Sequence, residues 1–491
     1  MTDVYLGIDL GTTSVKVLAL DGAGRELARG EASGRLRRPS RERAELDAAE
    51  ARGDLHSAMT AAMSGLRSDA TVRAVGFSCA MHGIMPVDAA GAPLGPIANW
   101  LDRRAAEVAD RWRADGTARA LYHATGAPVH PMLPSCKIAW FAEHEPELHR
   151  AAARWVSLKD WLVYELCGEW LADPGVASGT GFFALPARAW SADALSLARI
   201  APGRLPAVAS TRTRRRVRDA AAAALGLPRG VELVLGSSDG ALANLGTGAT
   251  QPGVWALTLG TSGALRATTA DATFDPDGRT FCYAADDSRY VVGGATSSAG
   301  AVVSALADLL FPDVARADRV TRFIAAAAES PAHGLPVVVP FLAGERAPYW
   351  RSDLRGAIEG LELDTGRDRI ARATVESALF ALADVGDVMR GLVGRPTSLR
   401  GTGHLATAPA VRELVATLFD CELLVSPRGD GSARGAAWTA AAALDAASAG
   451  DLAATVEPAE RTTPNRNDHG AAERFARYRA AVARAVAAPQ A

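Results

Sequence analysis

The sequence predicts an α/β protein made of two domains with similar cores, which face each other across a shared cleft. Two observations lead to this fold class. Short apolar runs that read as strands alternate with segments of helical periodicity along most of the 491 residues. In addition, a strand–tip–strand pattern with a small, hydroxyl-rich tip occurs near residue 11 and again near residue 260, almost half the chain apart. One such hairpin in each half indicates a duplicated core.

The first hairpin, residues 5–20, has a tip suited to holding phosphate. Glycine lets the backbone approach a ligand closely, and consecutive N–H groups with hydroxyl side chains can hold phosphate oxygens. Asp9, at the end of the incoming strand, is placed to meet a Mg²⁺ ion, which prefers carboxylate oxygens and water. An ordinary hairpin turn is the alternative for this tip taken alone. The candidate phosphate ligands are Gly11, Thr12, Thr13, Ser14 and, on the outgoing strand, Lys16.

The second hairpin, residues 254–266, repeats this pattern. An apolar strand meets a tip formed by Gly260, Thr261, Ser262 and Gly263, and a second apolar strand leaves it. We therefore expect each half of the chain to offer one phosphate-holding tip to the shared cleft.

Composition and charge limit the classes of partner. The chain is 48% hydrophobic and 22% charged with a formal net charge of −2, so neither nucleic acid nor an anionic membrane is an expected partner. Its five cysteines lack CxxC spacing, which argues against a disulfide framework or a zinc site. No apolar run reaches the roughly 18 residues that span a bilayer, and no leader precedes the first strand. We expect a cytoplasmic protein that acts on a small molecule, and a homodimer is consistent with the sequence.

Strands and helices alternate between the two hairpins, as an α/β fold requires. The expected strands cover residues 26–31, 72–78 and 231–235. The expected helices cover residues 55–66, 105–121, 138–141 and 156–166. We expect a loop at 173–181, because this segment is rich in small residues. The domain boundary is predicted at 245/246.

The same alternation continues after the second hairpin. The expected strands cover residues 290–292, 337–341 and 399–402. The expected helices cover residues 368–392, 409–418, 432–444 and 475–482. The helix at 368–392 is largely apolar, so we expect it to be buried.

Asp239 is the residue best suited to act as a general base. It comes directly after an apolar strand and lies between Ser238 and Gly240. In phosphoryl transfer to a sugar hydroxyl, an aspartate accepts the proton while a metal ion and backbone donors stabilise the phosphate charge. Asp239 is therefore also a candidate metal ligand. A helix N-cap is the alternative role, because Asp is a favoured cap and a helix follows; the two phosphate-type tips favour the catalytic role.

Other segments have the composition of a polyol-binding pocket. Sugar sites combine an aromatic face with carboxylate and guanidinium groups that bridge adjacent hydroxyls. A lone His is also common as a satisfied core residue, and Asp-Arg-Arg commonly begins a helix, so each segment has a structural alternative. Glu345 and Arg346, after a strand, are candidates for a salt-bridged corner of the cleft. The candidate polyol ligands are Met81, His82, Trp100, Asp102 and Arg104.

Taken together, these segments resemble the FGGY carbohydrate kinases, and the resemblance runs through nearly the whole chain. The matching motifs are residues 7–14, 80–83, 238–240, 260–263 and 344–348, with Trp100, Asp102 and Arg104. The resemblance implies two actin-like (ribonuclease H-like) domains with a catalytic cleft between them. Residues 1–245 would mainly bind the sugar, and residues 246–491 would mainly bind the nucleotide. It also implies ATP and Mg²⁺ as cofactors, Asp239 as the general base, and Asp9 near the metal and phosphates.

Within the family, four segments look more like gluconate kinases than xylulose kinases. They are residues 125–132, 238–246, 263–266 and 281–284. Gluconate differs from the neutral ketoses by its carboxylate, so we expect a cationic or donor group in the pocket. The candidates are His130 and Arg266, although Arg266 could instead face solvent from its strand. The implied reaction is phosphorylation of D-gluconate to 6-phosphogluconate.

One segment departs from the family pattern. The adenosine segment of the family typically carries Gly-Gly-Gly or Thr-Gly-Gly, followed by Ala, a basic residue and Ser, whereas residues 401–409 here read Gly-Thr-Gly-His-Leu-Ala-Thr-Ala-Pro. Gly403 and His404 are the residues expected to face the nucleotide. The bulky His404 makes the choice of nucleotide an open question.

Two alternative functions share this set of motifs. A xylulokinase or another pentulose kinase would use the same Met-His-Gly and Trp-x-Asp-x-Arg patterns. A catalytically weak sugar- and nucleotide-binding sensor would explain the altered adenosine segment, but it would not need Asp9, Asp239 and both tips. An actin-like filament protein is disfavoured further, because the polyol residues would then have no purpose.

Overall fold

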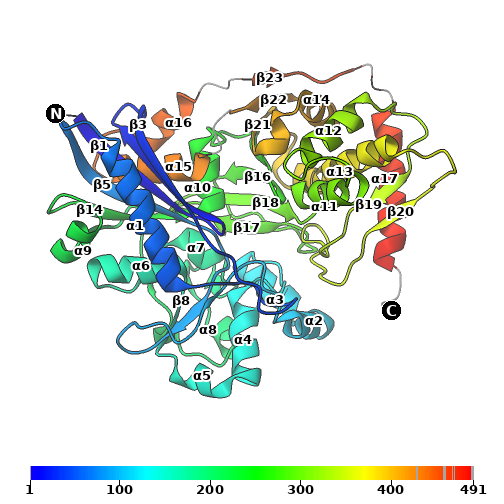
Figure 1. Cartoon of the computed structure of the whole chain (residues 1–491). Helices are drawn as coiled ribbons and strands as arrows, with labels where there is room; N and C mark the ends of the chain where they lie inside the picture. Colours follow the sequence, from blue (N-terminus) through cyan, green and yellow to red (C-terminus); the bar gives the residue numbers. More distant parts are fainter. Residues whose placement is uncertain (1, 427–429, 457–459, 467, 469, 488–491) are drawn as a thin grey trace.

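The computed structural model describes residues 2–426, 430–456, 460–466, 468 and 470–487. Figure 1 shows two α/β halves, each built on a mixed β-sheet with helices packed against it. Among the described residues, no helix combines the length and the apolar composition that crossing a membrane requires.

The N-terminal half is built on a six-stranded sheet in the order β13-β14-β5-β1-β2-β3. β1, β2 and β3 are antiparallel neighbours, whereas β5 is parallel to β1 and β14 is parallel to β5. The central strand β1 is buried along most of its length because elements cover both faces of the sheet. The strands are β1 (Thr2–Leu10), β2 (Ser14–Asp21), β3 (Glu26–Ser33), β5 (Ala70–Cys79), β13 (Arg214–Arg216) and β14 (Glu232–Ser238).

The C-terminal half is built on a seven-stranded sheet in the order β17-β18-β16-β15-β21-β22-β23. β15, β16 and β18 are antiparallel, β21 is parallel to β15, and β22 is parallel to β21. This repeats the order and direction of the N-terminal sheet and confirms the duplicated α/β core. The strands are β15 (Val254–Leu259), β16 (Gly263–Thr269), β17 (Phe281–Ala284), β18 (Tyr290–Thr296), β21 (Ser398–Thr402), β22 (Glu422–Val425) and β23 (Glu460–Thr462).

Helices pack around both sheets, and a mainly helical insertion joins β5 to β14 (Figure 1). The insertion contains α2 (Ala106–Ala114), α3 (Thr117–Thr125), α4 (Pro134–His144), α5 (Pro146–Ala151), α6 (Leu158–Cys167), α7 (Pro174–Ser178), α8 (Ala192–Leu197) and α9 (Asp219–Ala224). The other helices are α1 (Ala48–Ser64), α10 (Asp239–Gly246), α11 (Gly300–Leu310), α12 (Arg319–Glu329), α13 (Arg367–Val393), α14 (Pro409–Phe419), α15 (Gly431–Ala443), α16 (Ala449–Ala454) and α17 (Ala471–Ala487). Short strands pair outside the two sheets as β4 (Glu45–Leu46) with β7 (Ile97–Ala98), β6 (Met85–Val87) with β8 (Arg154–Val156), β9 (Leu171–Ala172) with β12 (Ala207–Val208), β10 (Phe183–Ala184) with β11 (Ala189–Trp190), and β19 (Val337–Val339) with β20 (Ala357–Glu359).

Two local expectations in the insertion are wrong. The single helix expected at 105–121 is two helices, because the chain turns at Gly116, whose φ of 86° is a left-handed value that glycine tolerates best. The loop expected at 173–181 contains the buried helix α7. Its N-cap is Asp173, whose carboxylate accepts hydrogen bonds from the N–H groups of Gly175 and Val176.

Helix α15 comes from the second half of the chain but packs on the N-terminal sheet. Gly7 of β1 and Gly76 of β5 are register partners, and both lie directly beneath this helix. A Cβ atom on Gly7 would come within 1.8 Å of the carbonyl oxygen of Ala433, and one on Gly76 within 2.3 Å of that of Ala436. Only glycine therefore permits this spacing. The predicted boundary at 245/246 remains a prediction, since one helix of the second range completes the core of the first.

Helix α10 is held just as closely against α15. A Cβ atom on Gly246 would lie 1.9 Å from the carbonyl oxygen of Gly431, and one on Gly435 would lie 2.2 Å from that of Leu242. Because α10 begins at Asp239, this contact fixes the position of that carboxylate relative to both sheets.

We expect Gly7→Ala to destabilise the fold, because the new methyl group would push α15 off the sheet. The cost should be about 1–3 kcal/mol or more, typical of overpacking in a core. Thermal unfolding followed by circular dichroism measures it.

Gly53→Ala is the matched control. Gly53 is exposed within α1, and no neighbouring group lies within 4 Å of the position that a Cβ atom would take there. The helix should therefore gain about 0.5–1 kcal/mol. Equal stability of Gly7→Ala and the unmodified protein would contradict the packing described for α15.

Candidate active site

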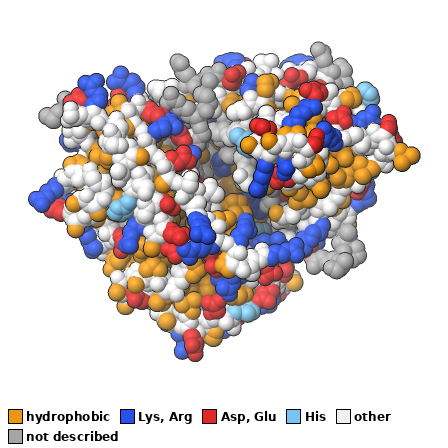
Figure 2. Space-filling model, in the orientation of Figure 1, with side chains coloured by type: hydrophobic (Ala, Val, Ile, Leu, Met, Phe, Trp, Pro, Cys, Tyr) orange, Lys and Arg blue, Asp and Glu red, His pale blue; other side chains and the backbone are white. Residues whose placement is uncertain are grey.

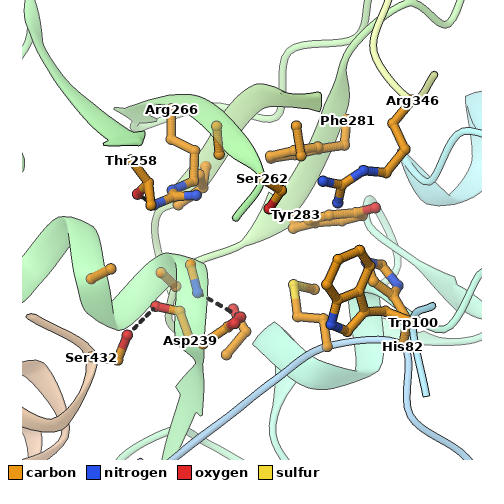
Figure 3. A pocket seen from close by; sticks show the side chains of 18 of the residues that line it. His82, Trp100, Asp239, Thr258, Ser262, Arg266, Phe281, Tyr283, Arg346 and Ser432 are labelled. Atoms are coloured by element: carbon orange, nitrogen blue, oxygen red, sulfur yellow. Dashed lines mark hydrogen bonds between the residues drawn. The ribbon is translucent and has the colours of Figure 1, made fainter. Parts of the chain in front are cut away.

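A cavity of about 300 Å³ lies between the two halves, and both halves contribute to its walls. The molecule is hollowed between the two halves on the face seen in Figure 2, and Figure 3 shows the side chains that line the cavity. From the first half these are Met81, His82, Trp100, Met132, Ser238, Asp239, Gly240, Ala241 and Ala243. From the second half they include Thr258, Ser262, Arg266, Phe281, Tyr283, Arg346, Trp350, Thr402 and Ser432.

Asp239 lies in the wall of this cavity, where β14 gives way to α10. Its carboxylate accepts a hydrogen bond of 2.8 Å from the N–H of Gly240. Ser238 occupies the N-cap position and Asp239 is the first residue of the helix, so the structure does not support the N-cap alternative. Burial raises the pKa of Asp239, although Arg266 and the N–H of Gly240 act to lower it. A carboxylate with a raised pKa at the edge of a cavity can accept a proton from a bound hydroxyl.

Arg266, on β16, lines the cavity beside Asp239 and does not face away into solvent (Figure 3). Its Nε donates to Oδ1 of Asn244 at 3.2 Å, and its Nη2 donates to Oγ1 of Thr258 at 2.8 Å. A Cβ atom on Gly240 would be 3.6 Å from Cδ of Arg266, which places the side chain against the first turn of α10. The guanidinium is thus held in a fixed orientation near the general-base candidate.

His82 also lines the cavity, and its backbone has a left-handed φ of 68°. Its Nδ1 lies 2.7 Å from the carbonyl oxygen of Gly179. Because a carbonyl only accepts, Nδ1 must carry the proton. Burial lowers the pKa of His82 to about 3, and Lys137 and Arg346 lower it as well. The neutral ring therefore keeps Nε2 as an acceptor. The left-handed backbone conformation of His82 is strained, and such strain is typical of functional sites.

Two buried lysines support these residues, and neither was expected from the sequence. Lys137 donates from Nζ to the carbonyl oxygens of His82 and Ala98 at 2.8 and 3.1 Å, and it also donates to that of Asn99. Lys159 forms a buried ion pair with Asp173 and donates to the carbonyl oxygens at the end of β14, just before Asp239. Each is the single lysine of its helix, α4 or α6, and lies among buried apolar residues, which is the signal that could have identified it.

The structure corrects the expectation that Asp102 and Arg104 contact a ligand. Trp100 lines the cavity, but these two side chains lie behind it, buried and outside the cavity walls. Nε of Arg104 donates to Oδ1 of Asp102 at 2.8 Å, and Arg104 also pairs with Glu45. Desolvation is the largest influence on the pKa of Asp102 and acts to raise it, but Arg104, the charge of Lys137 and the N–H of Ala44 together lower the pKa. The Asp102 carboxylate and the Arg104 guanidinium thus pair with each other, and this pairing fixes the loop that carries Trp100.

His130 is not part of the cavity wall either. It is buried behind Met132 and Trp350, which do line the cavity. Nδ1 of His130 accepts a hydrogen bond of 3.3 Å from the N–H of Met132, and the ring meets that of Trp350 edge to face. Burial, together with the nearby Arg346, lowers the pKa of His130 well below its ordinary value. A neutral, buried ring is poorly suited to recognise a carboxylate.

The first phosphate-type tip reaches the cavity through Trp100. Nε1 of Trp100 donates to Oγ1 of Thr12 at 3.0 Å. Lys16 is the register partner of Asp9 across the hairpin, and its Nζ lies 3.4 Å from Asp430 and 3.8 Å from Glu31. Lys16 thus connects the hairpin to the segment before α15. The other tip residues, Gly11, Thr13 and Ser14, form the turn itself, with Gly11 N–H donating to the carbonyl of Ser14.

Asp9 lies near Asp239, whose charge acts on the Asp9 carboxylate. Oγ of Ser78 donates to Oδ1 of Asp9 at 2.7 Å. Burial raises the pKa of Asp9 to about 6; the charge of Asp239 acts in the same direction, whereas the hydrogen bond from Ser78 and the charge of Lys16 act to lower the pKa. Within the part of the chain that the structure describes, neither carboxylate has a cation within ion-pair distance.

The second tip lies where α11 begins. The N–H of Gly300 donates to the carbonyl of Gly260 at 3.0 Å, and the N–H of Ala301 donates to that of Thr261 at 2.8 Å. Ser262 lines the cavity, which therefore extends to this tip.

His404 is exposed beside the second tip, at the start of a short 3₁₀ turn, His404–Thr407. A Cβ atom on Gly300 would be 3.4 Å from Cε1 of His404. Gly403 has a φ of 98°, and a Cβ there would meet the carbonyl oxygen of Leu259 at 2.4 Å, so glycine is required at this position. The two residues lie together at the outer edge of the second tip.

Glu345 and Arg346 have separate roles rather than forming a salt-bridged corner. Glu345 is buried outside the cavity wall and accepts hydrogen bonds from Thr296 Oγ1 and from the N–H groups of Ser297 and Arg346. Arg346 lines the cavity, with its guanidinium carbon 4.9 Å from the centre of the Trp100 ring. Tyr283 was not expected as a site residue, although the segment at 281–284 is one of those that resemble gluconate kinases.

Comparisons with known proteins agree with this geometry. The model of the N-terminal domain of the FGGY family of carbohydrate kinases matches residues 4–246, and that of the C-terminal domain matches residues 255–444. The chain is 31% identical to a gluconokinase of Bacillus subtilis, with 89% of this chain and 86% of that protein covered. It is 28% identical to a xylulose kinase of Escherichia coli, with 88% and 89% covered.

Solved structures show the same arrangement. A gluconate kinase of Lactobacillus acidophilus superimposes with a TM-score of 0.93 at 25% identity, and 99% of each chain is covered. A ligand-bound xylulose kinase of the same organism also gives 0.93, at 26% identity and with 99% of each chain covered. The duplicated α/β core is thus the two-domain, actin-like fold of these enzymes. With both domain models matched across one shared cavity, the chain belongs to the FGGY family of carbohydrate kinases, which are phosphotransferases.

Proposed function

We propose that this kinase transfers the γ-phosphoryl group of ATP to the terminal hydroxyl of a sugar acid, D-gluconate, giving 6-phosphogluconate and ADP. One observation carries the substrate class: the cavity that holds the half-buried Asp239 also contains two guanidinium groups, those of Arg266 and Arg346. A neutral ketose needs no such excess of positive charge, whereas a carboxylate and a phosphoryl group both bind guanidinium groups well.

Asp239 acts as the general base in this proposal. It accepts the proton of the attacking hydroxyl as the new oxygen–phosphorus bond forms and the bond to the leaving oxygen of ADP breaks. Its raised pKa favours uptake of that proton. Arg266 is held by Asn244 and Thr258 next to Asp239, where it would stabilise the charge on the transferred group without having to reorganise.

The two hairpin tips would hold the nucleotide phosphates from opposite sides of the cavity. The first offers Gly11, Thr12, Thr13 and Ser14, with Lys16 behind it, and the second offers Gly260, Thr261 and Ser262. Gly403 and His404 lie at the outer edge of the second tip, so the adenosine would extend in that direction.

Asp9 and Asp239 fit a divalent cation. The charge of Asp239 raises the pKa of Asp9, and neither carboxylate has an ion-pair partner among the described residues. Oxygen ligands of this kind suit Mg²⁺, which would supply positive charge to the phosphates. Hydrogen bonding from Ser78 fixes the orientation of Asp9.

Xylulose is the alternative substrate, favoured by the equally high structural similarity to a xylulose kinase. The mechanism assigned to Asp239 would be unchanged in that case. A sensor that binds without turnover is less favoured, because Asp9, Asp239 and both tips are present in one site.

Asp239→Asn tests the proposed mechanism. We expect kcat for gluconate to fall by about 10²–10⁴-fold, because an amide cannot accept the proton. ADP release coupled to NADH oxidation measures the rate.

Asp219→Asn is the matched control, since Asp219 is also the first residue of a helix, α9, but is exposed on the surface. Its turnover should equal that of the unmodified enzyme. Turnover of Asp239→Asn near the normal rate would remove Asp239 as the base.

Asp9→Asn tests the metal site through stability. The pKa of Asp9 in the folded protein, about 6, exceeds its ordinary value of 3.8. The stability that protonated Asp9 contributes is therefore present below pH 3.8 and is lost as the pH rises through about 6. In a chelating buffer at pH 8, we expect the variant to be more stable than the unmodified protein by up to about 3 kcal/mol.

The stability difference should vanish near pH 4, and Mg²⁺ should stabilise the unmodified protein more than the variant. Denaturant unfolding at both pH values, with and without Mg²⁺, gives these numbers. A variant that is less stable at pH 8 would show that Asp9 is structural.

A further inference from the structure

Two side chains in the cavity carry polar atoms that nothing in the described part of the protein satisfies. They are Nε of Arg346 and the hydroxyl of Tyr283. Arg346 is 8% exposed and Tyr283 is 4% exposed. Figure 3 shows the two side chains next to each other, across the cavity from Asp239. Buried polar groups are normally hydrogen-bonded, so this pair points to a bound group as the partner.

The guanidinium of Arg346 also lacks a counter-ion. Its Nη2 donates to the carbonyl oxygen of Thr296 at 2.8 Å, and no carboxylate of the described residues lies within ion-pair distance. The charge of the adjacent Glu345 favours the charged guanidinium, but its oxygens accept hydrogen bonds from Thr296 and from two backbone N–H groups and form no ion pair with Arg346. Trp100 contacts the guanidinium through its ring, and Nε is left without a hydrogen-bond acceptor.

A buried cation without a partner is costly, and a carboxylate is the group that best offsets that cost. The planar fork of arginine matches two carboxylate oxygens. Tyr283 offers a third donor. Burial raises the pKa of Tyr283, so its hydroxyl keeps its proton, and stacking on Phe281 at 4.5 Å between ring centres fixes its direction.

We propose that Arg346 and Tyr283 form the subsite that binds the carboxylate of the sugar acid, while Arg266 serves the phosphoryl group at the opposite end. This inference rests on the proposed function. It assigns carboxylate recognition to neither of the residues that the sequence suggested, since His130 lies outside the cavity wall and Arg266 lies beside Asp239.

The assignment also sets the direction of the substrate. The carboxylate would lie at Arg346 and Tyr283, and the carbon chain would pass Trp100 and His82. The terminal hydroxyl would then reach Asp239. Neutral His82, with Nε2 as an acceptor, suits a hydroxyl in the middle of such a chain.

Three variants of the full-length enzyme test the subsite: Arg346→Gln, Tyr283→Phe and Arg266→Gln. The readouts are kcat and KM for gluconate, and the affinities for gluconate and for D-glucitol, in which a hydroxymethyl group replaces the carboxylate. Calorimetry without nucleotide measures the affinities.

We expect Tyr283→Phe to weaken gluconate binding about 10-fold and Arg346→Gln about 100-fold, with little change for D-glucitol. Their effect should fall mainly on KM. Arg266→Gln should instead lower kcat and keep the preference for gluconate.

Arg188 and Tyr290 provide matched controls. They form a similar pair outside the cavity, with the guanidinium 5.8 Å from the centre of the tyrosine ring. Arg188→Gln and Tyr290→Phe should leave both affinities unchanged, which would show that losing an arginine or a tyrosine hydroxyl as such is not the cause.

The outcomes separate the subsite from the function on which it rests. If the unmodified enzyme prefers gluconate and both Arg346→Gln and Tyr283→Phe keep that preference, the subsite is wrong and the function stands. If the two variants bind D-glucitol and gluconate more weakly by the same factor, the role of Arg346 and Tyr283 is structural and the subsite is again wrong. If the unmodified enzyme binds D-glucitol as tightly as gluconate, the proposed substrate fails and the subsite fails with it.

Discussion

The close contact between α10 and α15 connects the fold to the chemistry. Both helices lie where the two halves meet, and their backbones approach to distances that only glycine allows, at Gly246 and Gly435. α15 rests in turn on Gly7 and Gly76 of the N-terminal sheet. Because Asp239 begins α10, and Ser432 Oγ at the start of α15 donates to the carbonyl of Asp239, the proposed base belongs to neither half alone. Its position depends on how the two halves meet.

The electrostatics of the cavity follow from this arrangement. Two guanidinium groups, from Arg266 and Arg346, enter from the second half, and Asp239 faces both of them. Buried charges of this kind cost stability unless they are paired. The ligands that would pair with them are anionic: a phosphoryl group near Arg266 and a carboxylate near Arg346. Binding such ligands would offset the cost of the buried charges, and the fixed guanidinium groups would need little reorganisation to receive them.

Much of this account could be predicted from the sequence, because it depends on local pattern. Strand–tip–strand repeats predicted the duplicated sheets, and the strand end at Asp239 indicated the base. The predictions that failed concern contacts between residues that are far apart in the sequence. Nothing local shows that Arg104 would pair with Asp102 and Glu45, or that Glu345 would accept a hydrogen bond from Thr296 and form no ion pair with Arg346. The small residues of α15 predict a helix but not which sheet it covers.

A substrate panel with the unmodified enzyme distinguishes a sugar-acid kinase from a kinase of neutral sugars. ADP release is followed with Mg²⁺-ATP and, in separate reactions, D-gluconate, D-xylulose, D-ribulose, glycerol or no sugar. The account predicts a kcat/KM for gluconate far above that for every neutral substrate, because only gluconate brings a carboxylate to a cavity with two guanidinium groups. A kcat/KM for xylulose equal to or above that for gluconate would contradict it.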